Sequence, residues 1–331
     1  MPSAPPSDLV ARFHGHALTL LPHPPAAAAP LALAVSGGAD SMAMLALAHA
    51  AFPDAVIAAT VDHGLRTGSA DEAQMVADHC TALGVPHEIL ALTGLARGPA
   101  VQERARTARY AALGEWAARH CALALATAHQ ADDQAETMLM RAARGVGLTG
   151  MRGIPAIGMA QGLAVIRPLL GWTRADLRAL CFAHAIPFAD DPGNADPAYE
   201  RVRVRAMLGQ QAWLDPRMLA RTADRLAQAD GALDWVAERL WTERASAGPD
   251  GAVTLAAGDL PRDLARRLVR RAIQRVRADA GIDSPGFADS ADIEPLLDAL
   301  TGGGGASHGG VMARANGENW QFRPAPPRRL P

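Results

Sequence analysis

The chain has 331 residues and a formal net charge of −2, and about half of its residues are apolar, which is enough for about two domains with full cores. All 32 basic residues are arginine. Without lysine the chain cannot contain the Gly-Lys-Ser/Thr of a Walker P-loop, a Schiff-base lysine, or a lysine that carries a nucleotide during transfer.

Three features of the sequence concern its cellular compartment. No apolar run approaches the ~20 residues that span a bilayer. The first residues lack the basic head and small-residue cleavage site of a signal peptide. The three cysteines, Cys80, Cys121 and Cys181, form no CxxC pair. We expect a cytoplasmic protein with no membrane partner.

Residues 1–30 are expected to form an N-terminal helix and a Pro/Ala-rich linker. Apolar, strand-like runs then alternate with helical segments. Strands are expected at 31–35, 55–61, 87–92 and 122–127, and helices at about 41–51, 69–83, 100–120 and from 131. This alternation predicts an α/β domain over 31–210, with a parallel sheet and helices on both faces. Ligands of such sheets bind beyond the carboxyl ends of the strands, where three polar clusters of this chain fall.

The first cluster is SGGADS, residues 36–41, between a strand and a helix start. Backbone N–H groups of a glycine-rich turn can close around phosphate oxygens, and the helix dipole favours the anion. Asp40 would repel a bare phosphate, so it fits such a site when Mg²⁺ lies between them. The alternative is a tight turn in which Ser41 or Asp40 caps the helix.

The cluster after the fourth expected strand, TAHQADDQAET (127–137), places Asp132, Asp133 and Glu136 at a helix start, with His129 just before. Spacings of three and four bring the carboxylates together. They could hold Mg²⁺, grip an ammonium group or deprotonate an attacking amine. The alternative is that the acids only complement the helix dipole, with Asp132 as a plain cap.

These motifs resemble a known family. SGGADS resembles the pyrophosphate-binding loop of the N-type ATP pyrophosphatases. Four further stretches, in this order, resemble tRNA(Ile)-lysidine synthetase: TVDHGLR (60–66), QERARTARYAAL (102–113), the segment 127–151 that begins TAHQADDQAET, and the segment 167–208 that begins RPLLGWTRADLR. The resemblance implies a PP-loop, adenine nucleotide α-hydrolase-like fold that covers residues 31–208.

The resemblance also implies a reaction. ATP, with Mg²⁺, would adenylate O2 of the wobble cytidine in a tRNA(Ile) with a CAU anticodon, and pyrophosphate would leave. An amine of free L-lysine would then displace AMP and give lysidine. The resemblance leaves the oligomeric state open, and a homodimer is one of the states considered. The rivals are a tRNA cytidine 2-thiolation enzyme, disfavoured by the missing CxxC, and a nucleotide- or RNA-binding module without turnover.

Site residues follow from the same resemblance. The catalytic candidates are Asp40, Asp132, Asp133 and Glu136, and Asp40 and Asp133 are also the metal candidates. The sequence departs from the family at Gln130, where a second His is common, and at Val202, where Asn is common. The predicted ATP-binding residues are Ser36, Gly37, Gly38, Ala39, Asp40, Ser41, Val61, Asp62, His63, Arg106, Arg109 and His129.

Arginines supply the predicted RNA contacts. Arg106 and Arg109 suit phosphate binding, or else form a solvated face paired with Glu103. The predicted tRNA-binding residues are Arg141, Arg144, Arg201, Arg203 and Arg205; for the first two the alternative is a favourable helix C-terminus.

Residues 211–331 are expected to form a helical, Arg-rich tRNA-binding region with a short strand-containing tail. Residues 201–277 carry 15 arginines against 9 acidic residues. Within them, 262–277 carries seven arginines opposite an apolar face, which is either a solvated helix face over a core or an RNA-binding face.

Overall fold

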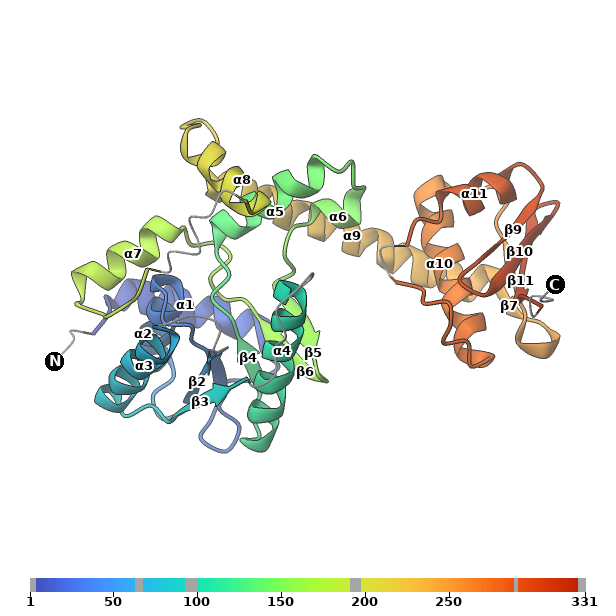
Figure 1. Cartoon of the computed structure of the whole chain (residues 1–331). Coiled ribbons are helices and arrows are strands. Elements are labelled where there is room, and N and C mark those ends of the chain that lie inside the picture. Colours follow the sequence, from blue (N-terminus) through green and yellow to red (C-terminus); the bar gives the residue numbers. More distant parts are fainter. Residues whose placement is uncertain (1–3, 63–67, 93–100, 191–197, 289–290, 327–331) are drawn as a thin grey trace. The chain divides into compact units, whose positions relative to one another are not determined.

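The computed structural model describes residues 4–62, 68–92, 101–190, 198–288 and 291–326, and the chain divides into two compact units, 1–227 and 228–331 (Figure 1). The division falls inside the long helix α9 (Pro216–Arg244), downstream of the domain boundary expected near residue 210. Within the described ranges, no helix is both long and apolar enough to cross a bilayer.

The first unit is built on a six-stranded sheet with the order β3-β2-β1-β4-β6-β5. All neighbouring strands are parallel except β5 and β6, which form a hairpin that the sequence did not predict. Gln161 and Gly162 turn this hairpin, both with positive φ, which is typical of a two-residue turn. The strands are β1 (Leu31–Ala34), β2 (Val56–Asp62), β3 (His87–Ala91), β4 (Ala124–Ala126), β5 (Ile157–Ala160) and β6 (Leu163–Ile166).

Helices cover both faces of this sheet, as predicted. One core cluster joins β1 and β2 to the helices α1 (Ser7–Leu20), α2 (Ala39–Ala51), α3 (Ser69–Leu83) and α7 (Arg174–Ala183). On the other face, Trp116 of α4 (Val101–Arg119) packs with side chains of β1, β2 and β4.

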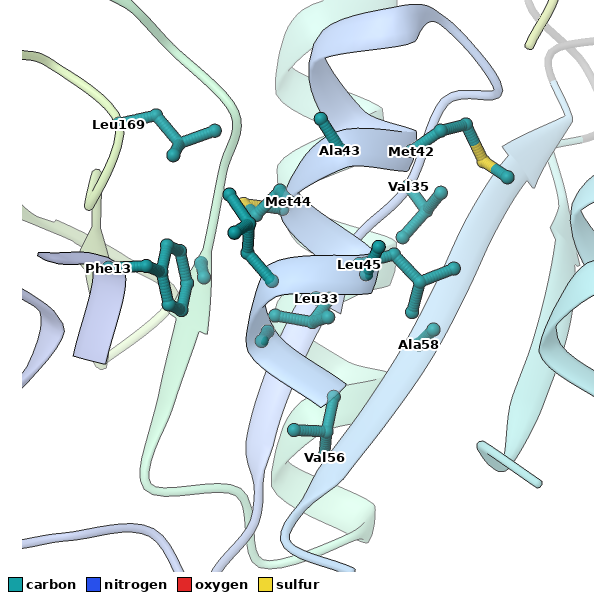
Figure 2. Close-up of a cluster of buried hydrophobic side chains, with 14 of the residues drawn as sticks. Phe13, Leu33, Val35, Met42, Ala43, Met44, Leu45, Val56, Ala58 and Leu169 are labelled. Carbon is teal, nitrogen blue, oxygen red and sulfur yellow. The ribbon is translucent and has the colours of Figure 1, made fainter. Parts of the chain in front are cut away.

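Helix α2 is buried almost all round, because it lies between the sheet and α1. Figure 2 shows Leu45 directed toward Ala58 of β2, while Met44 is directed toward Phe13 of α1. Nine of its thirteen residues are buried. A helix with no solvated face cannot shift without disturbing the core, so its N-terminus at residue 39 is held firmly at the carboxyl end of β1.

Besides the start of α9, three further helices belong to the first unit and lie above the carboxyl ends of the strands. They are α5 (Ala131–Ala142), α6 (Leu148–Met151) and α8 (Glu200–Gly209). Helix α5 follows β4, and α8 packs against α5. Residues far apart in the sequence, at 131–142 and 200–209, are thereby brought together.

The second unit packs two helices and the C-terminal part of α9 into one core with a five-stranded antiparallel sheet, ordered β7-β8-β11-β10-β9. The predicted fold class is confirmed, although the sheet is larger than the short tail that we expected. Its early strands are only three and four residues long, too short for a clear alternating pattern. The elements are α10 (Arg262–Asp279), α11 (Glu294–Thr301), β7 (Ala245–Ala247), β8 (Val253–Ala256), β9 (Gly305–His308), β10 (Val311–Asn316) and β11 (Asn319–Pro324), with a 3₁₀ turn at Pro249–Gly251.

Candidate active site

The SGGADS loop joins β1 to α2, and hydrogen bonds of a serine hydroxyl hold its conformation. Ser41 Oγ donates to the Gly38 carbonyl at 2.9 Å and accepts from the backbone N–H of Ser36 at 3.1 Å. Gly37 has φ +85°, a conformation that favours glycine. Gly38 is the N-cap residue and no described side chain caps the helix, so neither Ser41 nor Asp40 plays the capping role that we considered. The helix therefore presents uncapped N–H groups, as an anion site requires.

Asp40 stands in the first turn of α2 with an incompletely satisfied carboxylate. Gln130 Nε2 donates to its Oδ2 at 3.4 Å, while its Oδ1 is buried and makes no hydrogen bond in the described structure. Burial raises the pKa of Asp40 to about 6; the charge of Arg174 opposes this shift, and that of Asp133 adds to it. A buried carboxylate oxygen without a partner is the group that a cation would stabilise.

The start of α5 is capped by Gln130. Its Oε1 accepts from the backbone N–H groups of Asp132 and Asp133 at 2.5 and 3.3 Å, and Asp133 Oδ2 accepts from the Gln130 N–H at 3.1 Å. This is a capping box, so Asp132 is not the plain cap that we considered. Gln130 is also fully buried and reaches Asp40, so it joins the acid cluster to the SGGADS loop.

Glu136 is fully buried and held by three guanidinium groups. Arg201 Nε and Arg205 Nε donate to its two oxygens at 2.8 Å each, and Arg174 Nη2 donates at 3.2 Å. Burial alone would raise the pKa of Glu136, but the hydrogen bond from Arg205 and the charges of the three arginines outweigh it and lower the pKa. Glu136 therefore stays ionised and orients the arginines, and it is poorly suited to exchange a proton.

Arg174, the first residue of α7, belongs to this cluster, although the sequence did not single it out. Its backbone N–H donates to Asp132 Oδ2 at 2.9 Å, and its guanidinium lies 3.9 Å from Asp133 as well as bonding Glu136. Its neighbours Thr173 and Asp176 form a capping box at the start of α7. Nothing local in TRADL indicates a contact with residues 42 positions earlier.

Asp133 and His129 are both shifted toward their neutral forms. Burial raises the pKa of Asp133, against the charge of Arg201. Burial lowers the pKa of His129 to about 3, and the charges of Arg167 and Arg106 add to this shift. The His129 ring is neutral at pH 7, and its Nδ1 lies 2.9 Å from Thr127 Oγ1.

The other predicted ATP-binding residues lie at the same edge of the sheet or outside the described ranges. Val61 and Asp62 end β2, and Asp62 Oδ1 accepts from Ser69 Oγ at 2.8 Å. Arg106 is exposed, Arg109 is half-buried, and both guanidiniums lie over the Tyr110 ring. Their charges act on His129. His63 and the side chain of Glu103 lie outside the described part of the chain.

The predicted tRNA-binding arginines separate into two groups. Arg201 and Arg205 face the acid cluster through Glu136. The other three are engaged elsewhere: Arg141 Nη1 donates to the carbonyls of Gly150 and Gly153 at 2.8 Å each, Arg144 pairs with Glu200, and Arg203 Nη1 donates to the Ala198 carbonyl at 3.1 Å.

A cavity of about 460 Å³ adjoins the acid cluster. Asp132, Glu136, Arg174 and Arg205 form its charged wall, and the segment 208–216, which leads into α9, forms the rest. Leu208, Leu214 and Pro216 supply apolar surface, and Asp215 supplies one more carboxylate. Carboxylates, guanidiniums and apolar surface in one cavity suit a small zwitterion with an aliphatic chain.

Comparison with known proteins identifies the family. Residues 15–212 match the model of a PP-loop domain. A relative from Novosphingobium aromaticivorans, named tRNA(Ile)-lysidine synthase, is 43% identical over 300 residues, which is 90% of this chain and 89% of the relative. Proteins of the same name from Zymomonas mobilis and Methylobacterium nodulans are 38% and 41% identical, over 90% and 92% of this chain and 89% and 93% of theirs.

The chain belongs to the tRNA(Ile)-lysidine synthase family. The predicted resemblance is thereby confirmed, and so is an ATP-dependent ligase of the PP-loop type. A solved U34-tRNA thiolase from Methanococcus maripaludis, with its [4Fe-4S] cluster, has a similar fold: TM-score 0.52, 17% identity, 66% of this chain and 79% of that one. The sequence of the present chain contains no CxxC, and two of its three cysteines, Cys80 and Cys181, are buried.

The described residues of this tRNA(Ile)-lysidine synthase family member fit a magnesium ion brought in by ATP. They contain no group of three or more His, Cys, Asp or Glu side chains placed to hold a metal ion by themselves. Mg²⁺ is commonly bound by one or two carboxylates together with substrate phosphates. The unpartnered Oδ1 of Asp40, next to uncapped N–H groups of α2, matches that mode.

Proposed function

We propose that this chain is a tRNA(Ile)-lysidine synthase: it uses ATP to join free L-lysine to C2 of the wobble cytidine in a tRNA(Ile) with a CAU anticodon. One observation carries the proposal. Gln130 connects Asp40 of the SGGADS loop to a carboxylate–arginine cluster that lines a cavity of amino-acid size. The proposed phosphate site and the cavity proposed for the amino acid thus lie at one edge of the sheet.

ATP would place its β and γ phosphates on the uncapped N–H groups of α2 and in reach of the Ser36 hydroxyl. Asp40, and Asp133 behind it, would hold Mg²⁺, which when bound neutralises charge on the leaving pyrophosphate. Arg106 and Arg109 are our candidates for contacts to the α phosphate. Cytidine O2 would attack the α phosphorus, so that pyrophosphate leaves and the base carries AMP.

Lysine would occupy the cavity beside the cluster. Arg174 and Arg205 are suited to its carboxylate, because guanidinium binds carboxylate through two parallel hydrogen bonds. Asp132 and Asp215 are suited to an ammonium group, and Leu208 and Leu214 to the methylene chain.

The second step needs a neutral amine. Asp133 is also our candidate to take the proton from the lysine ammonium, because burial raises its pKa above the usual range of a carboxylate. The amine then attacks C2 of the adenylated base, and AMP leaves. We place the reaction in the cytoplasm, and a homodimer remains compatible with it.

The experiment uses ATP labelled in its α phosphate and a tRNA(Ile) transcript with a CAU anticodon. Without lysine, label should move to the tRNA while pyrophosphate is released. Addition of lysine should then discharge the label as AMP. Label that never joins the tRNA, with wild-type protein and Mg²⁺ present, would contradict the proposal.

A further inference from the structure

The basic helix α10 does not offer free arginines to RNA. Each of its seven arginines is engaged within the second unit. Five form ion pairs with carboxylates, and two donate to backbone carbonyls. The ion pairs join Arg262 to Glu294 and Asp298, Arg266 to Asp263 and Glu294, Arg267 to Asp230, Asp234 and Asp263, Arg271 to Glu238, and Arg275 to Asp279; Arg270 bonds Ala288 and Ala291, and Arg277 bonds Pro285 and Gly309.

This pairing decides between the two interpretations of residues 262–277 in favour of a solvated face over a core. The apolar side of α10, including Leu268, Val269 and Ile273, is buried against the sheet. Its charged side is largely neutralised, because every ion pair places a carboxylate beside a guanidinium. A polyanion would meet both signs of charge there.

The sheet of the second unit has one buried and one open face. Val253, Leu255, Ala313, Trp320 and Phe322 point to the helices and form the core. Side chains alternate along each strand, so the residues between them lie on the other face. The register aligns these residues across the strands: Ser246 with Thr254, Thr254 with Gln321, Gln321 with Arg314, and Arg323 with Met312.

This open sheet face carries hydrogen-bonding groups and two positive charges. Its polar members are Ser246, Thr254, Ser307, Arg314, Asn316, Asn319, Gln321 and Arg323. No Asp or Glu lies on it in any of the five strands, all of which are described. Glu318, the carboxylate nearest in sequence, lies in the turn between β10 and β11.

Arg314 and Arg323 lie on the adjacent strands β10 and β11, in diagonal positions. Both are exposed, and no ion pair joins either to a carboxylate in the described part of the chain. Diagonal side chains on paired strands are about 7–8 Å apart at Cα, close enough for two long arginines to act together. They differ in this respect from the five arginines of α10 that form ion pairs, and the other two, Arg270 and Arg277, are held by backbone carbonyls.

We propose that the open sheet face of the second unit binds the phosphate backbone of RNA through Arg314 and Arg323. The inference rests on the proposed function for the identity of the RNA, which would be the tRNA substrate. Two unpaired guanidiniums among amide and hydroxyl groups, with no carboxylate, complement a polyanion. A protein partner is disfavoured because Met312 is the only large apolar side chain on this face.

The test measures the dissociation constant for a tRNA transcript over a range of salt concentrations. In the double variant Arg314→Gln with Arg323→Gln, binding should weaken at low salt. The slope of log K against log salt should fall by about two, because each lost phosphate contact removes about one. The loss should be equal for tRNA(Ile) and tRNA(Met) transcripts, since backbone contacts carry no sequence information.

The matched control is Arg275→Gln, which also removes one exposed guanidinium from the second unit, but one that Asp279 already pairs. Its salt slope should equal that of the wild type. Gln321→Glu, which puts a carboxylate at the centre of the open sheet face, should weaken binding without changing the melting temperature.

An unchanged slope in the double variant, or an equal fall in Arg275→Gln, would overturn the inference. Failure of the wild type to adenylate tRNA would instead contradict the proposed function, because salt-dependent binding is measured without ATP or lysine. The two failures are therefore distinguishable.

Discussion

At the scale of single residues, the candidate site is organised around Glu136, a carboxylate with no solvent exposure that meets three arginines. The sequence predicted tRNA binding for Arg201 and Arg205 and catalysis for Glu136. It did not predict that these three side chains contact one another. Helix propensity and spacing describe neighbours within a helix, whereas this cluster depends on how α8 packs against α5.

We predict that Glu136→Gln destabilises the protein by about 2–3 kcal/mol. Removal of one partner from a fully buried ion pair costs about 3–5 kcal/mol, and the cost is smaller here because the arginines are partly solvated. Urea unfolding would measure this. The control Glu200→Gln removes the exposed partner of Arg144 and should change the free energy of unfolding by under about 0.5 kcal/mol. A stable but inactive Glu136→Gln protein would instead indicate direct catalysis.

The raised pKa of Asp40 predicts how the stability of the protein depends on pH. Its folded pKa of about 6 lies above the unfolded value of 3.8, so the folded state binds more protons between these values and stability falls as pH rises through them. Asp40→Asn removes the titrating carboxyl group and therefore this loss of stability. Without metal or nucleotide, the variant should gain stability over the wild type from about pH 4 to 6, reaching about 2–3 kcal/mol above pH 7.

Asp190→Asn is the control for that titration, because a hydrogen bond from Arg178 lowers the pKa of Asp190. A carboxylate with a lowered pKa stabilises the folded state above its unfolded pKa, so this variant should become less stable than the wild type as pH rises. A stability difference for Asp40→Asn that stays constant from pH 4 to 8 would refute the assignment.

At the scale of elements, the sequence predicted the strands and helices of residues 31–142 to within a few residues. Local signals suffice there, because each strand is a short apolar run and each helix begins after a polar cluster. The β5–β6 hairpin and the strands β7 and β8 were missed, although β1 and β4, which were predicted, are also only three or four residues long. Strands β5 and β7 have no buried residue, and Gly158 and Ser246 interrupt their apolar runs. The contact of Arg174 with Asp132 joins two helix starts across 42 residues, and no local pattern encodes it.

The cap of α5 yields an element-scale prediction. Gln130→Ala should cost about 1 kcal/mol through the lost cap, and activity should fall sharply because Asp40 and the acid cluster lose their link. Thr173→Ala removes the cap of α7 at a similar cost, without a bond to Asp40. Circular dichroism and adenylation assays would compare the two. Equal activities in these variants would show that the Gln130 link has no function.

At the scale of the whole molecule, the two units have separate cores and separate charge networks. In the second, Arg267 is largely buried and bonds the fully buried Asp230 at 2.5 Å. We predict that Arg267→Met removes this buried ion pair and destabilises this unit by about 3–5 kcal/mol.

Amide hydrogen exchange would localise the effect of Arg267→Met. Exchange should quicken in β8, β10 and β11, while β1, β2 and β4 keep wild-type protection, because the first unit has its own core. Arg275→Gln, which removes an exposed ion pair of the same helix, should leave both units unchanged. Equal loss of protection in both sheets would mean that the units unfold as one.

The most direct measurement is the transfer of labelled lysine to tRNA by the whole chain with ATP and Mg²⁺. We predict incorporation into a tRNA(Ile) transcript with a CAU anticodon, none into a tRNA(Met) transcript with the same anticodon, and loss of incorporation in Asp40→Ala. Pyrophosphate release without incorporated lysine would keep the adenylating site but assign another nucleophile. Neither pyrophosphate nor lysine transfer with either tRNA would contradict the function proposed for this chain.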